Sequence, residues 1–135
     1  WTPALTCSSS NPTISGGSAG TGKYRKIGSA VFIYYSASFV LSGVGSGTVQ
    51  ITGLPFTAGD DVSMYTGSPL SGRGLGKNAT TVQVVPIIAA DATNIQFNLF
   101  DINDYPGSEA RMGNSELSTD ADGANWYFCI NYIAA

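Results

Sequence analysis

Apolar and polar positions alternate most clearly across residues 30–42. Every second residue there is apolar or aromatic: Val31, Ile33, Tyr35, Ala37, Phe39 and Leu41. The positions between them begin with Phe32 and Tyr34 and become polar at Ser36 and Ser38. Because successive side chains of a β-strand point to opposite faces, this pattern predicts a strand with one core face and one partly covered face.

The last strand-forming segment, Asn125–Ile133, alternates in the same way. Its first face carries Trp126, Phe128, Ile130 and Tyr132. Six further segments rich in β-branched or aromatic residues lie between turn signals: Trp1–Cys7, Lys23–Ile27, Thr48–Thr52, Val62–Tyr65, Thr81–Ala89 and Asn94–Ile102. Such segments favour strands. Pro86 predicts an edge or a bulge in its strand, because proline lacks the N–H that a sheet ladder needs.

Three polar segments predict loops: Ser8–Thr21, Thr66–Ala79 and Asn103–Gly123, with brief pairing at Thr13–Ile14 in the first. No window longer than a turn or two has apolar residues at helical spacing. About eight short strands with turn signals between them predict an all-β fold. We expect an antiparallel, jelly-roll-like β-sandwich, a single domain over residues 1–135.

Composition excludes several classes of protein. Of the 135 residues, 43% are hydrophobic and only 11% are charged, which suits a packed β protein and not a disordered chain. The net charge of −3, with one basic cluster at Lys23, Arg25 and Lys26, argues against a nucleic-acid partner. No apolar run reaches the roughly twenty residues of a membrane helix. A start at Trp1 predicts a piece of a longer polypeptide, a processed form or an engineered start.

The chain has no histidine, which removes histidine-based catalysis. Its two cysteines, Cys7 and Cys129, lie near opposite ends and do not have zinc-ligand spacing. Two alternatives remain open for them. A disulfide would link the first and last strands if these are neighbours, and otherwise two buried thiols act as small apolar side chains.

The carboxylates predict little chemistry by themselves. A glycosidase needs a pair of acids at a set separation across a sugar, and most of the nine acids flank turns or lie in loops. Two clusters, Asp101-x-Asn103-Asp104 and Asp120-x-Asp122-Gly123-x-Asn125, collect oxygen ligands that suit calcium, although Asx turns explain them equally well. We therefore predict no metal, no cofactor and no enzymatic activity, with an acid-pair glycan hydrolase as one alternative.

Three short motifs occur in a fixed order: Trp1-Thr2-Pro3, then Gly22-Lys23-Tyr24-Arg25-Lys26-Ile27-Gly28, then Gly53-Leu54-Pro55-Phe56. This series, closed by an aromatic last strand, resembles the C-terminal β domain of tailed-bacteriophage tail-fibre and tail-spike-like proteins. Cys7, Cys129 and the loop Ser68–Asn78 depart from the family pattern.

The resemblance implies the C-terminal part of a longer chain in a virion. It also implies a homotrimer that contacts other virion proteins and whose loops bind a bacterial surface glycan or protein. A capsid decoration or cement protein is a second alternative.

Sugar binding is the chemistry that best suits such a domain, because exposed aromatic rings cover sugar C–H groups while polar side chains bond the hydroxyls. Aromatics in β proteins also serve as core or subunit interface, which is the competing interpretation. The residues on or beside the longer loops that we predict to bind ligand are Tyr65, Arg73, Tyr105, Arg111 and Asn114.

Overall fold

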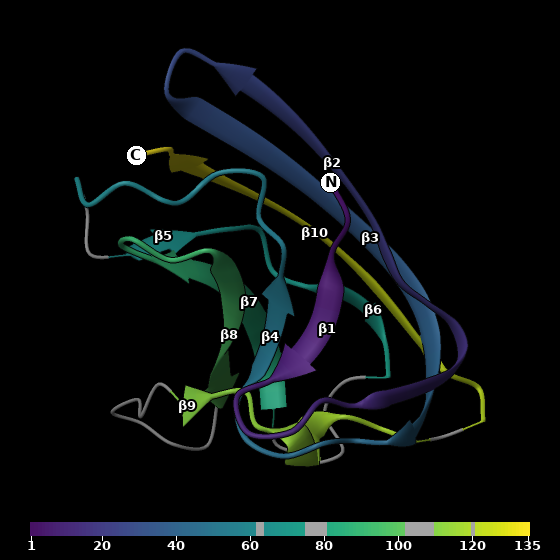
Figure 1. Cartoon of the computed structure of the whole chain (residues 1–135). Helices are drawn as coiled ribbons and strands as arrows, with labels where there is room; N and C mark the ends of the chain where they lie inside the picture. The colour runs from purple at the N-terminus through teal and green to yellow at the C-terminus, as the bar shows by residue number, and fades with distance from the viewer. Residues whose placement is uncertain (62–63, 75–80, 102–109, 120) are drawn as a thin grey trace.

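The chain forms two antiparallel sheets packed face to face (Figure 1). The structure is a computed structural model that describes residues 1–61, 64–74, 81–101, 110–119 and 121–135. Its elements are β1 (Ala4–Cys7), β2 (Thr13–Ile27), β3 (Ala30–Gly43), β4 (Val49–Thr52), β5 (Met64–Thr66), β6 (Ser71–Arg73), β7 (Thr81–Ala89), β8 (Asn94–Asp101), β9 (Ala110–Arg111), a 3-10 turn η1 (Asn114–Glu116) and β10 (Ala124–Ile133). The predicted all-β, antiparallel sandwich is confirmed.

One sheet has the strand order β1-β4-β8-β7-β5, with β9 paired to β8, and the other has the order β2-β3-β10-β6. The segment from β5 to β6 passes from the first sheet to the second. β5 pairs with β7, Gly67 bridges to Ile130, and β6 pairs with β10. This crossing closes one side of the sandwich and places residues 66–68 beside the outer face of β10.

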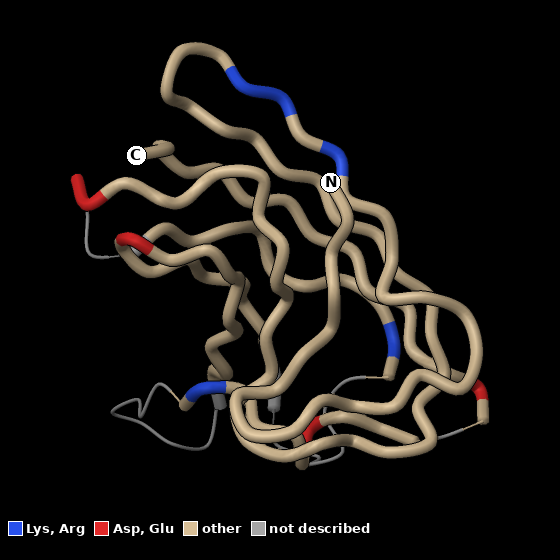
Figure 2. Tube along the Cα trace, in the orientation of Figure 1, with Lys and Arg blue, Asp and Glu red and all other residues tan. Residues whose placement is uncertain are grey.

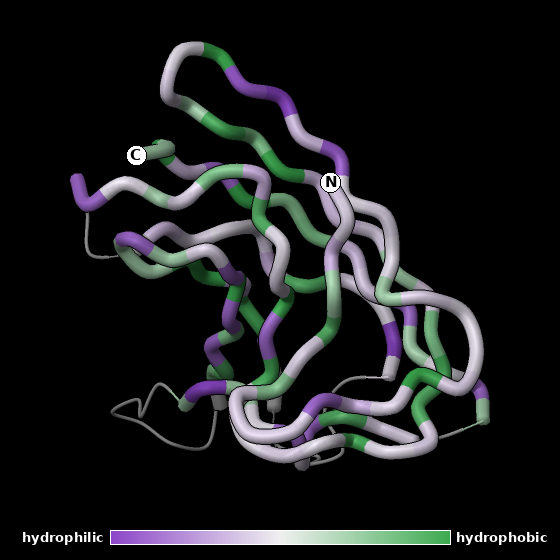
Figure 3. Tube along the Cα trace, in the orientation of Figure 1, coloured by the Kyte–Doolittle hydropathy of each residue, from purple (hydrophilic) through white to green (hydrophobic). Residues whose placement is uncertain are grey.

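The alternation of β3 and β10 sets the core. All six apolar positions from Val31 to Leu41, and Trp126, Phe128, Ile130 and Tyr132, are buried as predicted. Phe97 of the opposite sheet packs edge-on against Trp126 and Phe128, with ring centroids 5.7 Å apart in each case. The hydropathy colouring of Figure 3 shows apolar segments on both layers. Burial of these rings is the main force that holds the two sheets together.

The predicted loop Ser8–Thr21 is wrong over most of its length, because β2 is one strand from residue 13 to residue 27. The serines and glycines of this segment have low strand propensity, so the sequence gives no strand signal there. Gly17 and Gly20 have φ angles of 74° and 100°, next to register shifts in the β2–β3 ladder. A side chain at either position would overlap the backbone of β3. The glycines therefore let β2 follow the curve of β3.

Two other predicted loops also contain strands, so the described residues form ten strands and not the eight expected. β6 lies within Thr66–Ala79, and β9 and η1 lie within Asn103–Gly123. Each is only two or three residues long and is held by a neighbouring strand, so no local pattern reveals it. The prediction for residues 62–63 lies outside the described residues.

The prediction of a bulge at Pro86 is wrong, because the register shift of β7 falls between Thr81 and Gln83. The alternative of an edge holds locally, because β5 pairs only with Ile87–Ala89 of β7 and its ladder ends before Pro86. The Pro86 carbonyl accepts a hydrogen bond from the Gly67 N–H at 3.0 Å. In a strand the N–H and C=O of one residue point to the same side. The missing N–H of Pro86 therefore faces Gly67, and the β7–β8 ladder loses no donor.

The β2–β3 hairpin extends past the rest of the sandwich (Figure 1). It turns at Gly28–Ser29 as predicted, with a φ of 60° at Gly28. A positive φ at the first central position alone is typical of a type II′ turn. Beneath the hairpin, Phe56 contacts Tyr24 edge-on at 5.6 Å, and the Lys26 ammonium lies 4.3 Å from its ring centroid.

The three motifs that occur in a fixed order meet in space. The Trp1 main-chain nitrogen donates to the Gly22 carbonyl at 2.9 Å, and the Trp1 indole covers Gly22. Gly53, with a φ of 86°, leaves no room for a side chain beside the Thr2 carbonyl. With the contacts of Phe56, these form one structural corner between the N-terminal segment, the hairpin and the segment after β4.

Candidate functional site

Large aromatic side chains are exposed on the outer face of the β2-β3-β10-β6 sheet. Phe32 and Tyr34 of β3 are 48% and 49% exposed, and Tyr127 of β10 is 42% exposed. They occupy the positions between the core residues of these two strands, so the alternation that builds the core also turns them outward. Half-exposed rings grouped on one face mark a surface that can cover an apolar ligand face.

A cavity of about 570 Å³ lies over this face. The strand register gives two rows of side chains across it. Arg25, Phe32 and Asn131 are neighbours in one row, and Lys23, Tyr34 and Cys129 are neighbours in the next. Strands lie about 4.8 Å apart and successive rows about 7 Å apart, so each ring has a polar or charged neighbour within reach.

Residues 66–68 form the far edge of this cavity. The Ser68 hydroxyl accepts from the Cys129 N–H at 2.9 Å, and the Ser68 N–H donates to the Cys129 carbonyl at 2.8 Å. Gly67 lies so close to Cys129 and Ile130 that a side chain there would overlap them. These contacts hold the edge firmly against β10.

A second cavity, of about 540 Å³, adjoins the first along β3. Apart from Tyr127 and Ala37 its lining is made of hydroxyl side chains and glycines: Ser18, Thr21, Ser36 and Ser38, with Gly17 and Gly20. Small residues on β2 leave the floor low, and the hydroxyls can donate and accept hydrogen bonds. We call the two cavities together the outer groove.

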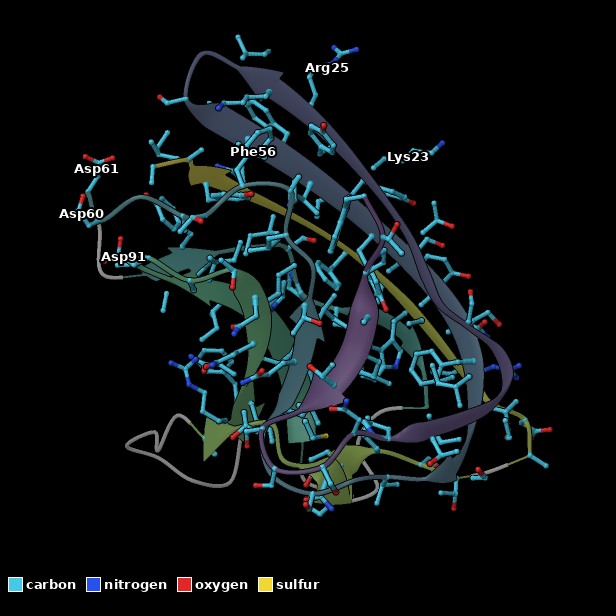
Figure 4. All side chains as sticks on the ribbon, in the orientation of Figure 1. Lys23, Arg25, Phe56, Asp60, Asp61 and Asp91 are labelled. Atoms are coloured by element: carbon cyan, nitrogen blue, oxygen red, sulfur yellow. The ribbon has the colours of Figure 1, made fainter. Side chains whose placement is uncertain are left out.

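The outer groove has an unequal charge. Lys23 and Arg25 line it, and among the described residues no aspartate or glutamate does. Both basic side chains project from β2 away from the sandwich, whereas Phe56 lies on the other side of the hairpin (Figure 4). Asp60, Asp61 and Asp91 lie at a separate end of the molecule (Figures 2 and 4).

These acids do not build a metal centre. Within the described residues, no three side chains of His, Cys, Asp or Glu are placed to hold a metal ion. The two sequence clusters that suit calcium include residues 102–104 and 120, which lie outside the described residues. No helix in the part of the chain that the structure describes is long and apolar enough to cross a membrane.

The structure does not bring the predicted ligand residues together. Tyr65 is half-buried and packs against Tyr132 at 6.2 Å, and its hydroxyl is buried without a hydrogen-bond partner. Asn114 braces a turn: its Nδ2 donates to the Gly45 carbonyl at 3.2 Å and its Oδ1 accepts from the Gly47 N–H at 3.3 Å. Both side chains are engaged within the fold and do not line the groove.

Of the two predicted arginines, Arg73 is exposed on β6 opposite Asn125, at the edge of the four-stranded sheet. Arg111 is exposed on β9 of the other sheet and donates from Nη1 to Asn98 Oδ1 at 2.7 Å. Tyr105 lies outside the described residues. None of the predicted ligand residues that the structure describes lines the outer groove.

The sequence contains a pattern that marks some of the groove residues as outward-facing, and the prediction of ligand residues did not use it. Phe32 and Tyr34 stand at the positions of the strand that turn polar further along, which is unusual for two large rings. Lys23 and Arg25 are two residues apart on β2, so their side chains point to the same face of the strand. Pairing β2 with β3 and β3 with β10 was needed to place these four side chains and Tyr127 on one surface.

Of the two alternatives left open for the cysteines, the disulfide is wrong, because Cys7 and Cys129 are both free. Cys7 faces the core from β1, and Cys129 is exposed in the outer groove on β10. The two strands belong to different sheets, so the first and last strands are not neighbours. Burial raises the pKa of the Cys7 thiol, which donates to the Val44 carbonyl at 3.7 Å. The alternative of two buried thiols holds for Cys7 only.

No protein-family model, curated protein or solved structure matches the chain. The resemblance to tail-fibre domains therefore stays a prediction from the motifs.

Proposed function

We propose that this chain is a non-enzymatic binding module that holds a glycan in the outer groove. The proposal rests on three half-exposed rings on one face, Phe32, Tyr34 and Tyr127. Hydroxyl, amide and cationic side chains border these rings. Sugar rings have apolar C–H faces and a rim of hydroxyls, so they need both kinds of contact in one groove. Ligand sites commonly combine aromatic surface with a few placed polar groups.

The volume and shape of the groove favour a ligand over a flat subunit contact. Cores of stable subunit interfaces are apolar and closely packed. Here one half of the face is hollowed over aromatic rings and the other half is lined by serine, threonine and glycine. A polysaccharide chain fits a groove that changes from aromatic to hydroxyl-rich along its length.

The biological setting rests on the resemblance. We propose a domain at the tip of a tail fibre, as a homotrimer on a virion, that attaches to a glycan of the host surface. Mutual contact of the three motifs supports their being one structural unit of such a domain. Light scattering of the purified chain tests the trimer, and electron microscopy of the parent particle separates a fibre from a capsid decoration.

The binding claim is tested with Phe32→Ala and Tyr34→Ala on an array of bacterial surface glycans, followed by calorimetry with the glycans that bind. Each ring is expected to contribute about tenfold in Kd, the usual effect of an anchoring aromatic. Phe100→Ala is the matched control, because Phe100 is 38% exposed but lies on β8 of the other sheet. Its binding should equal that of the unmodified chain.

A covalent block gives a second measurement that does not depend on a truncated side chain. A bulky maleimide should react with the exposed Cys129 and spare the buried Cys7. The labelled protein should lose glycan binding, and the Cys129→Ser protein treated with the same maleimide should keep it. If no glycan binds, or if Tyr34→Ala changes only the oligomeric state, then the face is a subunit interface and the proposal is wrong.

A further inference from the structure

We infer that the glycan held by the outer groove is anionic, with its acid groups at the Lys23–Arg25 end. This inference rests on the proposed function and names the class of ligand. It starts from the basic cluster on β2, which the structure divides between two faces. Lys26 turns inward over the Phe56 ring, whereas Lys23 and Arg25 turn outward and line the groove.

The two groove cations are available to a ligand. Within the described residues, neither Lys23 nor Arg25 forms an ion pair or a side-chain hydrogen bond. They stand two residues apart on one strand, so their side chains start about 7 Å from each other on the same face. Arg25 adjoins Phe32 and Lys23 adjoins Tyr34 in the sheet register. A sugar ring stacked on either aromatic would therefore have a cation beside it.

The rest of the molecule strengthens this contrast. The chain has a net charge of −3, yet the described lining of the groove contains two cations and no carboxylate. Figure 2 shows basic residues along β2, whereas the acidic residues lie away from this hairpin, at several separate places. A cationic groove on an acidic protein attracts anions and orients them toward the groove.

The groove also limits what kind of anion fits. The outward positions of β3 from Phe32 to Ser38 span about 20 Å, so the groove holds a chain of several sugar residues and not a single ion. Beyond Tyr34 the lining is neutral and hydroxyl-rich. An extended ligand therefore meets charge at one end only. Nucleic acid carries a phosphate at every nucleotide and normally meets many cations, so we favour an acidic polysaccharide.

The test compares ligands that differ only in charge. Oligogalacturonates of several lengths are titrated beside the same oligomers after carboxyl reduction, and a sulfated oligosaccharide beside its desulfated form. At low salt the acidic forms should bind about tenfold tighter than their neutral partners, and the difference should shrink as salt rises. Affinity should increase with length until the groove is filled.

Two single substitutions form a matched pair. Arg25→Gln and Lys26→Gln each remove one positive charge from adjacent residues, but only Arg25 faces the groove. Arg25→Gln should reduce the preference for acidic forms. The double variant Lys23→Gln/Arg25→Gln should abolish it. Lys26→Gln should keep that preference, and thermal melting confirms that each variant is folded.

The outcomes separate this inference from the proposed function. Equal binding of acidic and neutral oligomers, sensitive to Tyr34→Ala, overturns the anionic ligand and leaves glycan binding in place. A preference that Lys26→Gln reduces as strongly as Arg25→Gln also overturns it, since the effect would then come from net charge. Binding of a single-stranded oligodeoxythymidylate, with no glycan of either kind bound, overturns both.

Discussion

Gly22→Ala is the sharpest structural test of how the ordered motifs fit together. A methyl group at Gly22 would overlap the indole of Trp1, and the φ angle of Gly22 is not in the left-handed region, so backbone strain is not involved. The Trp1 indole is the part of this contact that can move, because the atoms that a methyl group would meet are side-chain atoms and not backbone. We expect the substitution to displace the indole from β2.

The expected cost follows from the surface that Trp1 buries. A fully buried tryptophan covers about 200 Å² of surface, worth about 5 kcal/mol at 25 cal/mol per Å². Trp1 is partly buried and packs against Tyr35 at 6.3 Å, so loss of about half of that burial costs about 2 to 3 kcal/mol. For a domain of this size the melting temperature should fall by about 10 °C.

The assay is urea unfolding of Gly22→Ala, Trp1→Ala and the double variant. If Gly22→Ala acts by displacing Trp1, the free energy of unfolding of the double variant should be no lower than that of the less stable single variant. Gly16→Ala is the control on the same strand, because its methyl group would lie 3.7 Å from Val40, an ordinary contact. Additive losses in the double variant would refute the claim that the indole covers Gly22.

Two further predictions concern the tyrosines. Tyr65→Phe should leave stability unchanged or raise it by about 1 kcal/mol in urea unfolding, because the Tyr65 hydroxyl is buried without a partner; a loss of stability or of glycan binding would contradict this placement. Stability should also fall as pH rises above about 10, the pKa of an unfolded-state tyrosine. Burial raises the pKa of Tyr132 to about 12 and also raises that of Tyr35, which donates to the Ala19 carbonyl at 2.5 Å. Between the pKa of the unfolded tyrosines and that of the folded ones, the unfolded chain binds fewer protons than the folded chain. The free energy of unfolding therefore falls with pH until the folded tyrosines also ionise. A stability that is constant from pH 9 to pH 12 would be inconsistent with these buried hydroxyls.

The sequence alone determined the fold class and the core, because both depend on local alternation. The predicted core positions, every second residue from Val31 to Leu41 and from Trp126 to Tyr132, all face inward, and the strands at Thr81–Ala89 and Asn94–Asp101 were placed within a residue. A period of two is a property of each strand by itself, so no partner is needed to detect it. Strand β2 was missed where glycine and serine remove the pattern, since its conformation comes from pairing with β3.

Only the tertiary structure decided where the candidate site lies. Each groove residue belongs to a strand whose neighbours are far away in sequence: residues 23–25 lie beside residues 32–34, and these lie beside residues 129–131. The same long-range pairing separated Cys7 from Cys129 and gave Asn114 a structural role in a distant turn. Local spacing reports which face a side chain takes, but strand order decides which side chains share that face.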